Sequence, residues 1–254
     1  MTFMNKLRIP FHLLVVGFLT LSISLAHAEE EIWDPIEPVN RGIFWFNDKV
    51  DRVLFEPVAR IYDALLPGPA KTSVGNFFDN LRYPIYLVSD LAQFKFAQMG
   101  NHTARFLINT TVGGLGFFDP ATDWGFEEHY EDVGVALAYQ GVPAGPYIVI
   151  PFLGPSNLRD VVGRVADGFL HPTSYVAYTD VAEQSQHGIM FGSRAVEVVD
   201  ARAKAIEPIE DARDSAVDPY LFFQGAYYQR RAGYLYDGNP PEEEYEDEDY
   251  FEEE

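Results

Sequence analysis

Apolar residues recur at helical spacing in several separate stretches of this chain. In residues 71–82, Val74, Phe77, Phe78 and Leu81 follow the i, i+3, i+4, i+7 pattern of one helix face. Comparable patterns predict amphipathic helices in residues 40–55, 59–66, 101–112, 127–140, 158–169, 188–214 and 220–236.

Prolines, glycines and capping residues divide these helices. Pro57 predicts an end or a kink in the first helix, and Pro208 predicts a kink within residues 188–214, because proline lacks the N–H that a helix interior uses. Ser156 is the expected N-cap of the helix that follows it. Asp218 followed by Pro219 predicts another helix start, with proline at the first helical position.

Residues 141–155 contain four prolines and three glycines, which exclude a long helix there. They enclose a short apolar run, residues 147–150, for which we expect a hairpin-like loop rather than part of a sheet. No internal repeat is evident. Because amphipathic helices dominate the rest, the predicted fold class is all-α.

The N-terminus has the pattern of a secretory signal peptide. Lys6 and Arg8 precede an apolar run over residues 11–25, and Ala26-His27-Ala28 is a cleavage pattern. An uncleaved anchor is the alternative, but the run is shorter than the roughly 20 residues of a membrane-spanning helix. We therefore expect a signal peptide over residues 1–28, a helical domain over 29–239 and a disordered acidic tail over 240–254.

The net charge of −21 and the absence of cysteine narrow the function. An acidic chain is repelled by nucleic acid and by anionic head groups, so any lipid binding must rest on apolar contact. Without cysteine, disulfides, thiolate metal sites and acylation at an N-terminal cysteine are excluded for this sequence. The acidic tail lacks the ligand spacing of a calcium loop and is expected to be a solvated segment.

The chain lacks the patterns that usually mark catalysis or cofactor binding. No serine lies in a nucleophile signature. The histidines at 102, 129, 171 and 187 have no recognised metal spacing. Residues 113–116 are glycine-rich, but they follow a predicted helix and no Lys-Ser/Thr comes after them, which excludes phosphate-binding and dinucleotide loops. We expect no catalytic residues, no metal and no cofactor.

Three segments, residues 34–47, 105–119 and 141–160, closely resemble the MlaA/VacJ family of outer-membrane phospholipid-trafficking proteins. They read DPIEPVNRGIFWFN, RFLINTTVGGLGFFD and GVPAGPYIVIPFLGPSNLRD. Asp218-Pro219-Tyr220 and residues 226–231 extend the likeness, which covers roughly residues 33–238. Any one segment alone would be weak evidence, but together they are specific.

The resemblance implies a single, ring-like domain of amphipathic helices in the periplasmic leaflet of the outer membrane, with an amphiphilic channel through it. Phospholipid misplaced in the outer leaflet would pass through this channel to a soluble periplasmic lipid carrier similar to MlaC. A trimeric porin would hold the ring in place. No covalent chemistry is implied, so the chain is not expected to be an enzyme.

The resemblance also assigns roles to residues. The segment that flanks and gates the channel is expected to use Gly141, Gly145, Pro146, Tyr147, Arg159 and Asp160. The structural motif residues are Asn40, Arg41, Gly113, Gly114, Gly116, Phe117, Phe118 and Asp119. For Arg159 and Asp160 a salt bridge or loop tether remains an equal alternative, and for Asn40 so does helix capping. We expect Gly141→Pro to stiffen the loop without unfolding the chain.

Two further points stay open from the sequence. Amphipathic helices also pack soluble cores, so a soluble periplasmic lipid-binding or scaffold protein is the main alternative, and a phospholipase is a more distant one. The family's usual cysteine after the signal peptide is absent. Either apolar helix faces and a porin partner hold the protein at the membrane, or it is bound more loosely than its relatives.

Overall fold

The computed structural model describes residues 32–178 and 183–241; the predicted signal peptide and nearly all of the acidic tail lie outside them. The described chain is mostly helical, which confirms the predicted fold class. Its helices, with a π-helical turn η1 and a 3-10 segment η2, are α2 (Glu37–Val50), η1 (Asp51–Phe55), α3 (Glu56–Leu65), α4 (Gly68–Leu81), α5 (Tyr83–Gln93), α6 (Phe96–Thr111), α7 (Pro120–Asp123), α8 (Val133–Tyr139), α9 (Leu158–Leu170), η2 (Pro172–Tyr178), α10 (Glu183–Lys204), α11 (Ile206–Ser215) and α12 (Pro219–Leu235). No helix in the described part of the chain combines the length and the hydropathy needed to cross a bilayer.

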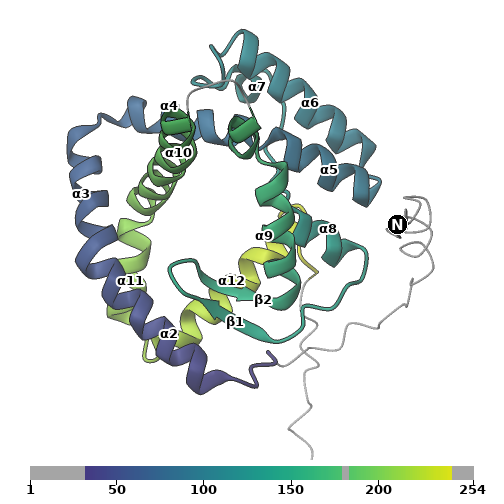
Figure 1. Ribbon diagram of the computed structural model, residues 1–254. Helices are drawn as coiled ribbons and strands as arrows, with labels where there is room; N and C mark the ends of the chain where they lie inside the picture. Colours follow the sequence, from purple (N-terminus) through teal and green to yellow (C-terminus); the bar gives the residue numbers. More distant parts are fainter. Residues whose placement is uncertain (1–31, 179–182, 242–254) are drawn as a thin grey trace, which may run out of the picture.

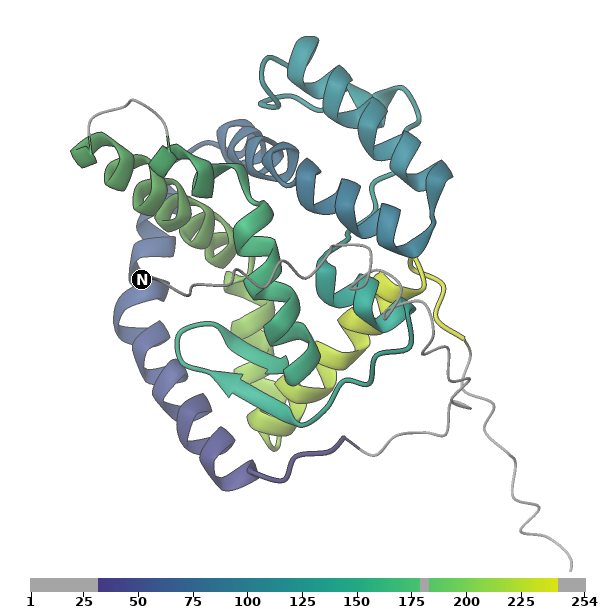
Figure 2. The ribbon, with the colours of Figure 1, turned by 45° about the vertical axis from the view of Figure 1, so that its right-hand side comes forward.

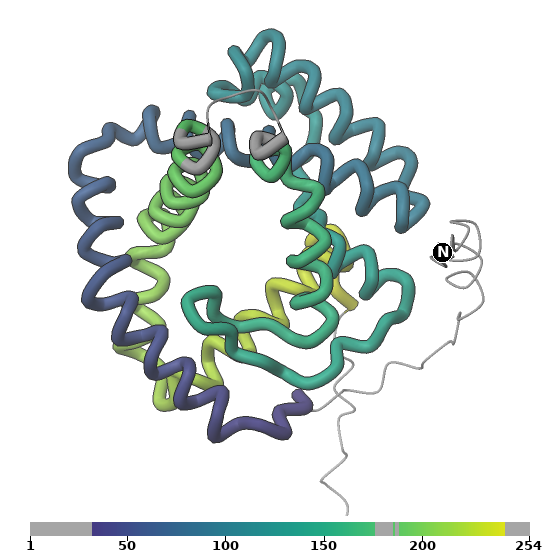
Figure 3. Tube along the Cα trace, viewed as in Figure 1, coloured from purple at the N-terminus to yellow at the C-terminus, as the bar shows by residue number. Residues whose placement is uncertain are grey.

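The helices are arranged as a ring (Figure 1). The continuous rod α2–η1–α3 forms one side, α4 to α6 form the top of the view, and α9 with the β hairpin and α12 completes the circuit. Helices α10 and α11 return along the inner side of α3. The trace in Figure 3 shows the same closed circuit, so the ring-like arrangement is confirmed.

The regular α-helical pattern of the rod α2–η1–α3 is interrupted just before Pro57, where an end or a kink was expected. Asp51–Phe55 form a π-helical turn, and Pro57 lies in the first turn of α3. Backbone N–H groups in a first turn do not need an intrahelical partner, so proline is tolerated there.

Pro208 behaves in the same way. The expected long helix over residues 188–214 is interrupted at Ala205, so that Pro208 lies in the first turn of α11. The break falls next to Lys204, whose carbonyl a proline at position 208 would meet, so the expected interruption by Pro208 is present. The expected helix over 127–140 is shorter as well. It begins only at Val133, where the Asp132 side chain accepts a hydrogen bond from Val135 N.

The proline-rich segment forms a true two-stranded sheet, which corrects the expectation of a loop without sheet pairing. Strand β1 (Tyr147–Ile150) pairs antiparallel with β2 (Gly154–Asn157), and Tyr147 lies opposite Asn157. Ser156 therefore lies in a strand. The N-cap of α9 is Asn157, whose Oδ1 accepts a hydrogen bond from Asp160 N at 2.8 Å. Helix α12 passes along this hairpin in both ribbon views (Figures 1 and 2).

Helices α8 and α9 cross closely beside the hairpin. A Cβ placed on Gly163 of α9 would lie 2.4 Å from Gly134 N on α8, so no larger residue fits at this contact. Two helix backbones therefore touch directly here.

The ring is closed between its first helix and the hairpin. Asn40 of α2 is fully buried, and its Nδ2 donates to Tyr147 O at 2.9 Å and to Asp34 Oδ1 at 2.7 Å. Its Oδ1 accepts from Val149 N at 2.9 Å. Asn40 lies within the helix and does not cap it, since α2 begins at Glu37. One amide group thus joins residues more than 100 positions apart.

We predict that Asn40→Ala lowers the free energy of unfolding by about 3 kcal/mol, because Tyr147 O and Val149 N would lose their buried partner. Thermal or urea unfolding of the purified protein measures the change. Asn101→Ala is the matched control, since Asn101 donates to Glu127 O at an exposed position; its effect should stay below about 1 kcal/mol. Equal losses in the two variants would contradict the assigned role of Asn40.

Candidate functional site

Large apolar side chains are exposed along the rod and on several other elements. On the rod they include Val53, Ile61 and Leu65, which are 80, 60 and 76% exposed. Further exposed apolar side chains are Trp45, Leu54 and Val58 on the rod, and Leu107, Phe118, Trp124, Val162, Val165, Phe169, Val196 and Val198 elsewhere in the described chain. Soluble monomers rarely expose apolar surface on this scale, so these faces indicate contact with an apolar phase or partner.

The opposite face of the same rod is charged and contacts α10 and α11. Arg202 forms two hydrogen bonds with the Asp51 carboxylate, at 2.7 and 2.8 Å. Arg213 contacts Asp51 at 2.7 Å and Glu56 at 2.9 Å. Burial raises the pKa of the Asp51 carboxyl, but the two guanidinium groups outweigh it and hold that pKa below its usual range. The rod therefore carries ion pairs inward and apolar side chains outward.

A cavity of about 300 Å³ lies between this charged face, the tip of the hairpin and α12. Its size is at the lower end of ligand pockets. The walls combine aromatic rings with guanidinium groups, contributed by Phe44, Phe55, Phe152, Phe223, Arg202 and Arg213. Such a surface suits a molecule that has both a polar and an apolar part.

The hairpin and its flanks bring together many of the residues that the sequence singled out. Tyr147 is fully buried in an aromatic cluster with Tyr220 and Tyr227. Arg41 pairs with Asp218 at 2.9 Å and its guanidinium lies 4.4 Å from the centre of the Tyr220 ring. These contacts join α2 to the start of α12.

Arg159 and Asp160 connect the loop before β1, residues 141–146, to α12. Arg159 Nη1 donates to Val142 O at 3.1 Å, and Arg159 N donates to Ala144 O at 3.1 Å. Asp160 is 3% exposed, forms an ion pair with Arg231 at 2.7 Å and accepts a hydrogen bond from the Tyr227 hydroxyl. This geometry is that of a loop tether and a buried ion pair, one of the two alternatives left open by the sequence.

Gly141 and Gly145 both adopt the left-handed conformation, with φ of +81° and +69°. Gly141 N also donates to Ala138 O at 2.9 Å. Proline fixes φ near −65° and has no N–H, so Gly141→Pro would disrupt this turn instead of only stiffening it. The expectation that Gly141→Pro stiffens the loop and leaves the local structure intact therefore does not hold. Pro146 precedes β1, and its carbonyl accepts from Leu158 N at 3.2 Å.

The remaining motif residues lie elsewhere, at the corner between α6 and α7 (Figure 1). Gly114 and Gly116 have φ of +62° and +92°, and a Cβ on Gly113 would meet Phe118 O at 2.3 Å. Phe117 stacks on Phe77 of α4. The Asp119 side chain caps α7 by accepting from Thr122 N, and it pairs with Arg105 at 2.9 Å. These residues shape a turn whose apolar side chains, such as Phe118, are exposed.

Asn47 is a contact that the sequence analysis missed. It lies seven residues after Asn40 on the same face of α2, and it binds the hairpin tip as Asn40 binds the hairpin base. Its Nδ2 donates to Ile150 O at 2.9 Å and its Oδ1 accepts from Phe152 N at 2.8 Å. The Phe152 ring also packs on Phe46. The repeat of asparagine at i and i+7 was a visible signal for this pairing.

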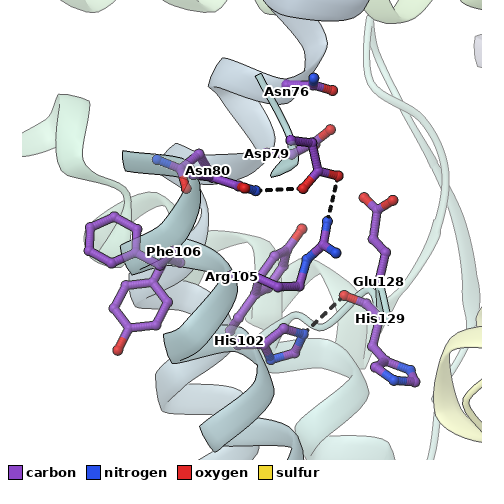
Figure 4. Close-up of a pocket in the computed structure, with 12 residues that line it drawn as sticks. Asn76, Asp79, Asn80, His102, Arg105, Phe106, Glu128 and His129 are labelled. Atoms are coloured by element: carbon purple, nitrogen blue, oxygen red, sulfur yellow. Dashed lines mark hydrogen bonds and ion pairs between the residues drawn. The ribbon is translucent and has the colours of Figure 1, made fainter. Parts of the chain in front are cut away.

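The polar cluster between α4, α5 and α6 is the part of the described structure that most resembles a catalytic site (Figure 4). His102 contacts the Asp90 carboxylate at 2.6 Å and His129 O at 3.2 Å, so both ring nitrogens face acceptors. Both nitrogens are thus in contact with protein groups, and the small cavity of about 50 Å³ beside the ring is lined by no serine. Among the described residues, no group of three or more potential ligands is placed to hold a metal ion.

Comparison with known proteins supports a definite relationship. The family model described as MlaA lipoprotein matches residues 32–233. The protein of Escherichia coli (strain K12) named intermembrane phospholipid transport system lipoprotein MlaA is 33% identical over 203 residues, which cover 78% of this chain and 76% of that protein. An uncharacterised protein of Rickettsia felis is 30% identical over 202 residues, covering 79% and 77%.

A solved structure is similar to the whole ring. It is described as the structural basis for maintenance of bacterial outer membrane lipid asymmetry. The two share 29% sequence identity and a TM-score of 0.68, and the match covers 81% of this chain and 99% of that chain.

We predict that Asn47→Ala releases the hairpin tip without opening the ring. Amide hydrogen exchange at Phe152 should speed up about tenfold, because its N–H loses its acceptor. Exchange at Val149, which bonds to Asn40, should stay within twofold. Asn76→Ala on α4 is the control and should change neither amide. Unaltered exchange at Phe152 would mean that Asn47 does not hold the tip.

Proposed function

The chain belongs to the MlaA lipoprotein family, and from this premise we propose that it is the outer-membrane component of an intermembrane phospholipid transport system. In this role it removes mislocalised phospholipid from the outer leaflet and passes it to a periplasmic carrier, which maintains lipid asymmetry. The name of its relative in Escherichia coli and the subject of the similar solved structure, the maintenance of bacterial outer membrane lipid asymmetry, support this role.

The observation that carries the proposal is the inverted arrangement of the rod α2–η1–α3. Its apolar side chains, among them Val53 and Ile61, are exposed, whereas Asp51 and Glu56 are paired with arginines inside the ring. A soluble helix normally buries its apolar face. A helix that lies in the interface of a membrane does the reverse and directs its apolar face into the acyl region.

The amphiphilic cavity beside the hairpin supports transport without covalent chemistry. A phospholipid needs apolar contacts for its chains and donors for its oxygen atoms, and the cavity offers phenylalanine rings together with Arg202 and Arg213. We assign the gating role to the hairpin and the loop before it, including Gly141, Gly145, Pro146 and Tyr147. Asn47 then acts as the contact that holds the gate in the observed position.

Partners and location follow from the family. A trimeric porin is proposed to hold the ring, and a soluble MlaC-like carrier is proposed to receive the lipid at the periplasmic face. The sequence contains no cysteine for acylation. We propose that the exposed apolar helix faces supply the membrane contact in place of an acyl chain. Each CH₂ group that they bury in the membrane contributes about 0.8 kcal/mol to binding.

The membrane-contact part of this proposal predicts the effect of charge on α3. Ile61→Glu together with Leu65→Glu should release the protein from washed membranes, because a charged group in the acyl region is costly. The control adds the same charge at exposed polar positions, with Thr72→Glu and Ser215→Glu. Fractionation after high-salt and carbonate washes measures retention. Complete release of the unmodified protein would favour the alternative, a soluble periplasmic lipid-binding or scaffold protein.

The transport part predicts the behaviour of cells. Deleting the gene should raise the amount of phospholipid in the outer leaflet. Returning the unmodified gene should restore the low amount. The protein purified from detergent-solubilised outer membrane should carry phospholipid and a porin. Normal lipid asymmetry in the deletion strain would argue against the proposed transport. Cleaved lipid after incubation of the purified protein with labelled phospholipid would establish a phospholipase instead.

A further inference from the structure

A second cavity, of about 180 Å³, lies where α9 and α10 approach the start of α5. It is separate from the phenylalanine-lined cavity near the hairpin tip, and no residue lines both. Helices α9 and α10 form facing inner sides of the ring and are joined through η2 (Figure 3). The volume is far above the roughly 10–15 Å³ that one water molecule needs.

His171 contributes an unpaired donor to this cavity. The residue is 2% exposed, and burial first of all, with help from Arg194, lowers its pKa to about 4, so the ring is neutral at pH 7. Its Nδ1 accepts a hydrogen bond from Thr173 N at 3.4 Å and lies 2.9 Å from the Thr173 hydroxyl, which can also donate to it. The proton of the neutral ring is therefore assigned to Nε2. Nε2 is buried and has no hydrogen-bond partner among the described residues. A buried donor of this kind calls for an acceptor.

Three arginines line the same cavity. Arg82 and Arg194 share a single carboxylate, that of Glu197, at 2.7 and 2.9 Å. Arg164 Nη2 donates to Pro155 O at 3.1 Å, which is a neutral acceptor. Two guanidinium groups share one carboxylate and the third donates to a neutral carbonyl. A guanidinium group has five N–H donors, so these arginines keep donors for a further acceptor.

The other carboxylates of the cavity are engaged by protein groups. Glu131 is held by Lys95 at 3.1 Å, and Asp132 is held by Arg231. Asp167 accepts from Val133 N, and burial raises its pKa to about 6. A further anion would therefore be bound through the N–H groups of the arginines and not through a net positive charge of the cavity.

Helix α9 presents two distinct faces here. Arg164, Asp167 and Gly168 line the cavity, while Val165 and Phe169 on another face are exposed. A lipid lying along α9 would thus find donors for its polar end beside an apolar surface for its chains.

We propose that this cavity is a phosphate subsite, which receives the phosphodiester of a lipid head group as the lipid passes through the ring. Arg164 and Arg194 supply charge-assisted hydrogen bonds in the planar geometry that suits phosphate, and His171 Nε2 supplies a neutral donor. The inference rests on the proposed transport function. Inorganic phosphate offers the same chemistry, so the test must separate the two sources.

The experiment measures binding to the purified full chain in a non-ionic detergent by titration calorimetry. The probes are a short-chain phosphatidylglycerol, a diacylglycerol with the same chains and inorganic phosphate. We expect the phospholipid to bind more tightly than either of the other two. Arg164→Gln and Arg194→Gln should each weaken phospholipid binding about tenfold, through the loss of a charge-assisted hydrogen bond, and leave diacylglycerol binding unchanged.

Arg52→Gln is the matched control. Its side chain is half exposed and pairs with Asp48 outside this cavity, so phospholipid binding should not change although the net charge changes equally. Arg164→Lys keeps the charge but removes the planar fork and should give an intermediate loss. Because Arg164 is exposed, its variants are expected to fold, and circular dichroism verifies this.

The outcomes separate the two proposals. Phospholipid binding that is equal in the unmodified chain and in folded Arg164→Gln and Arg194→Gln variants would overturn the phosphate subsite and leave transport standing. Inorganic phosphate that binds as tightly as the phospholipid, with the same loss in the variants, would overturn the lipid head group as the occupant. A folded unmodified chain that binds neither phospholipid nor diacylglycerol would contradict the proposed function itself.

Discussion

The structure depends on one arrangement, the pairing of asparagine amides on a helix with the backbone of a two-stranded hairpin. A hairpin of four-residue strands is marginal by itself, because only one partner satisfies each strand. Asn40 and Asn47 provide donors and acceptors to the free side of β1 and to the tip. The first helix thus acts as a substitute strand, and the same contacts close the ring.

Because the ring is closed by polar contacts, many of its buried side chains are polar. Among the described residues, polar and charged side chains make up a large share of the buried set, including Asp90, Asp160 and Arg202. Each of these groups is costly to bury alone and is held by ion pairs or hydrogen bonds. The apolar side chains that would form the core of a soluble bundle remain outside. A membrane around the ring would supply the missing apolar environment.

Features set by local sequence were predictable, and features set by distant contacts were not. The helix over residues 71–82 and the Asp218 cap followed from spacing and capping chemistry within a few residues. The N-cap of α9 is Asn157 instead of Ser156 because β2 extends through Asn157, the residue at which the extended chain ends and the helix begins. Helical periodicity predicts that a helix has an apolar face but cannot tell whether that face points inward, so the membrane-facing side came from the family resemblance and not from spacing.

The contact between Gly134 and Gly163 has a mechanical consequence. Where two backbones touch with no side chain between them, the distance cannot adjust through rotamer changes, and the two helices move as one body. Helices α8 and α9 therefore form a rigid wall beside the hairpin. If the hairpin gates the ring as proposed, this glycine pair is the fixed support against which the strands and the loop before them move.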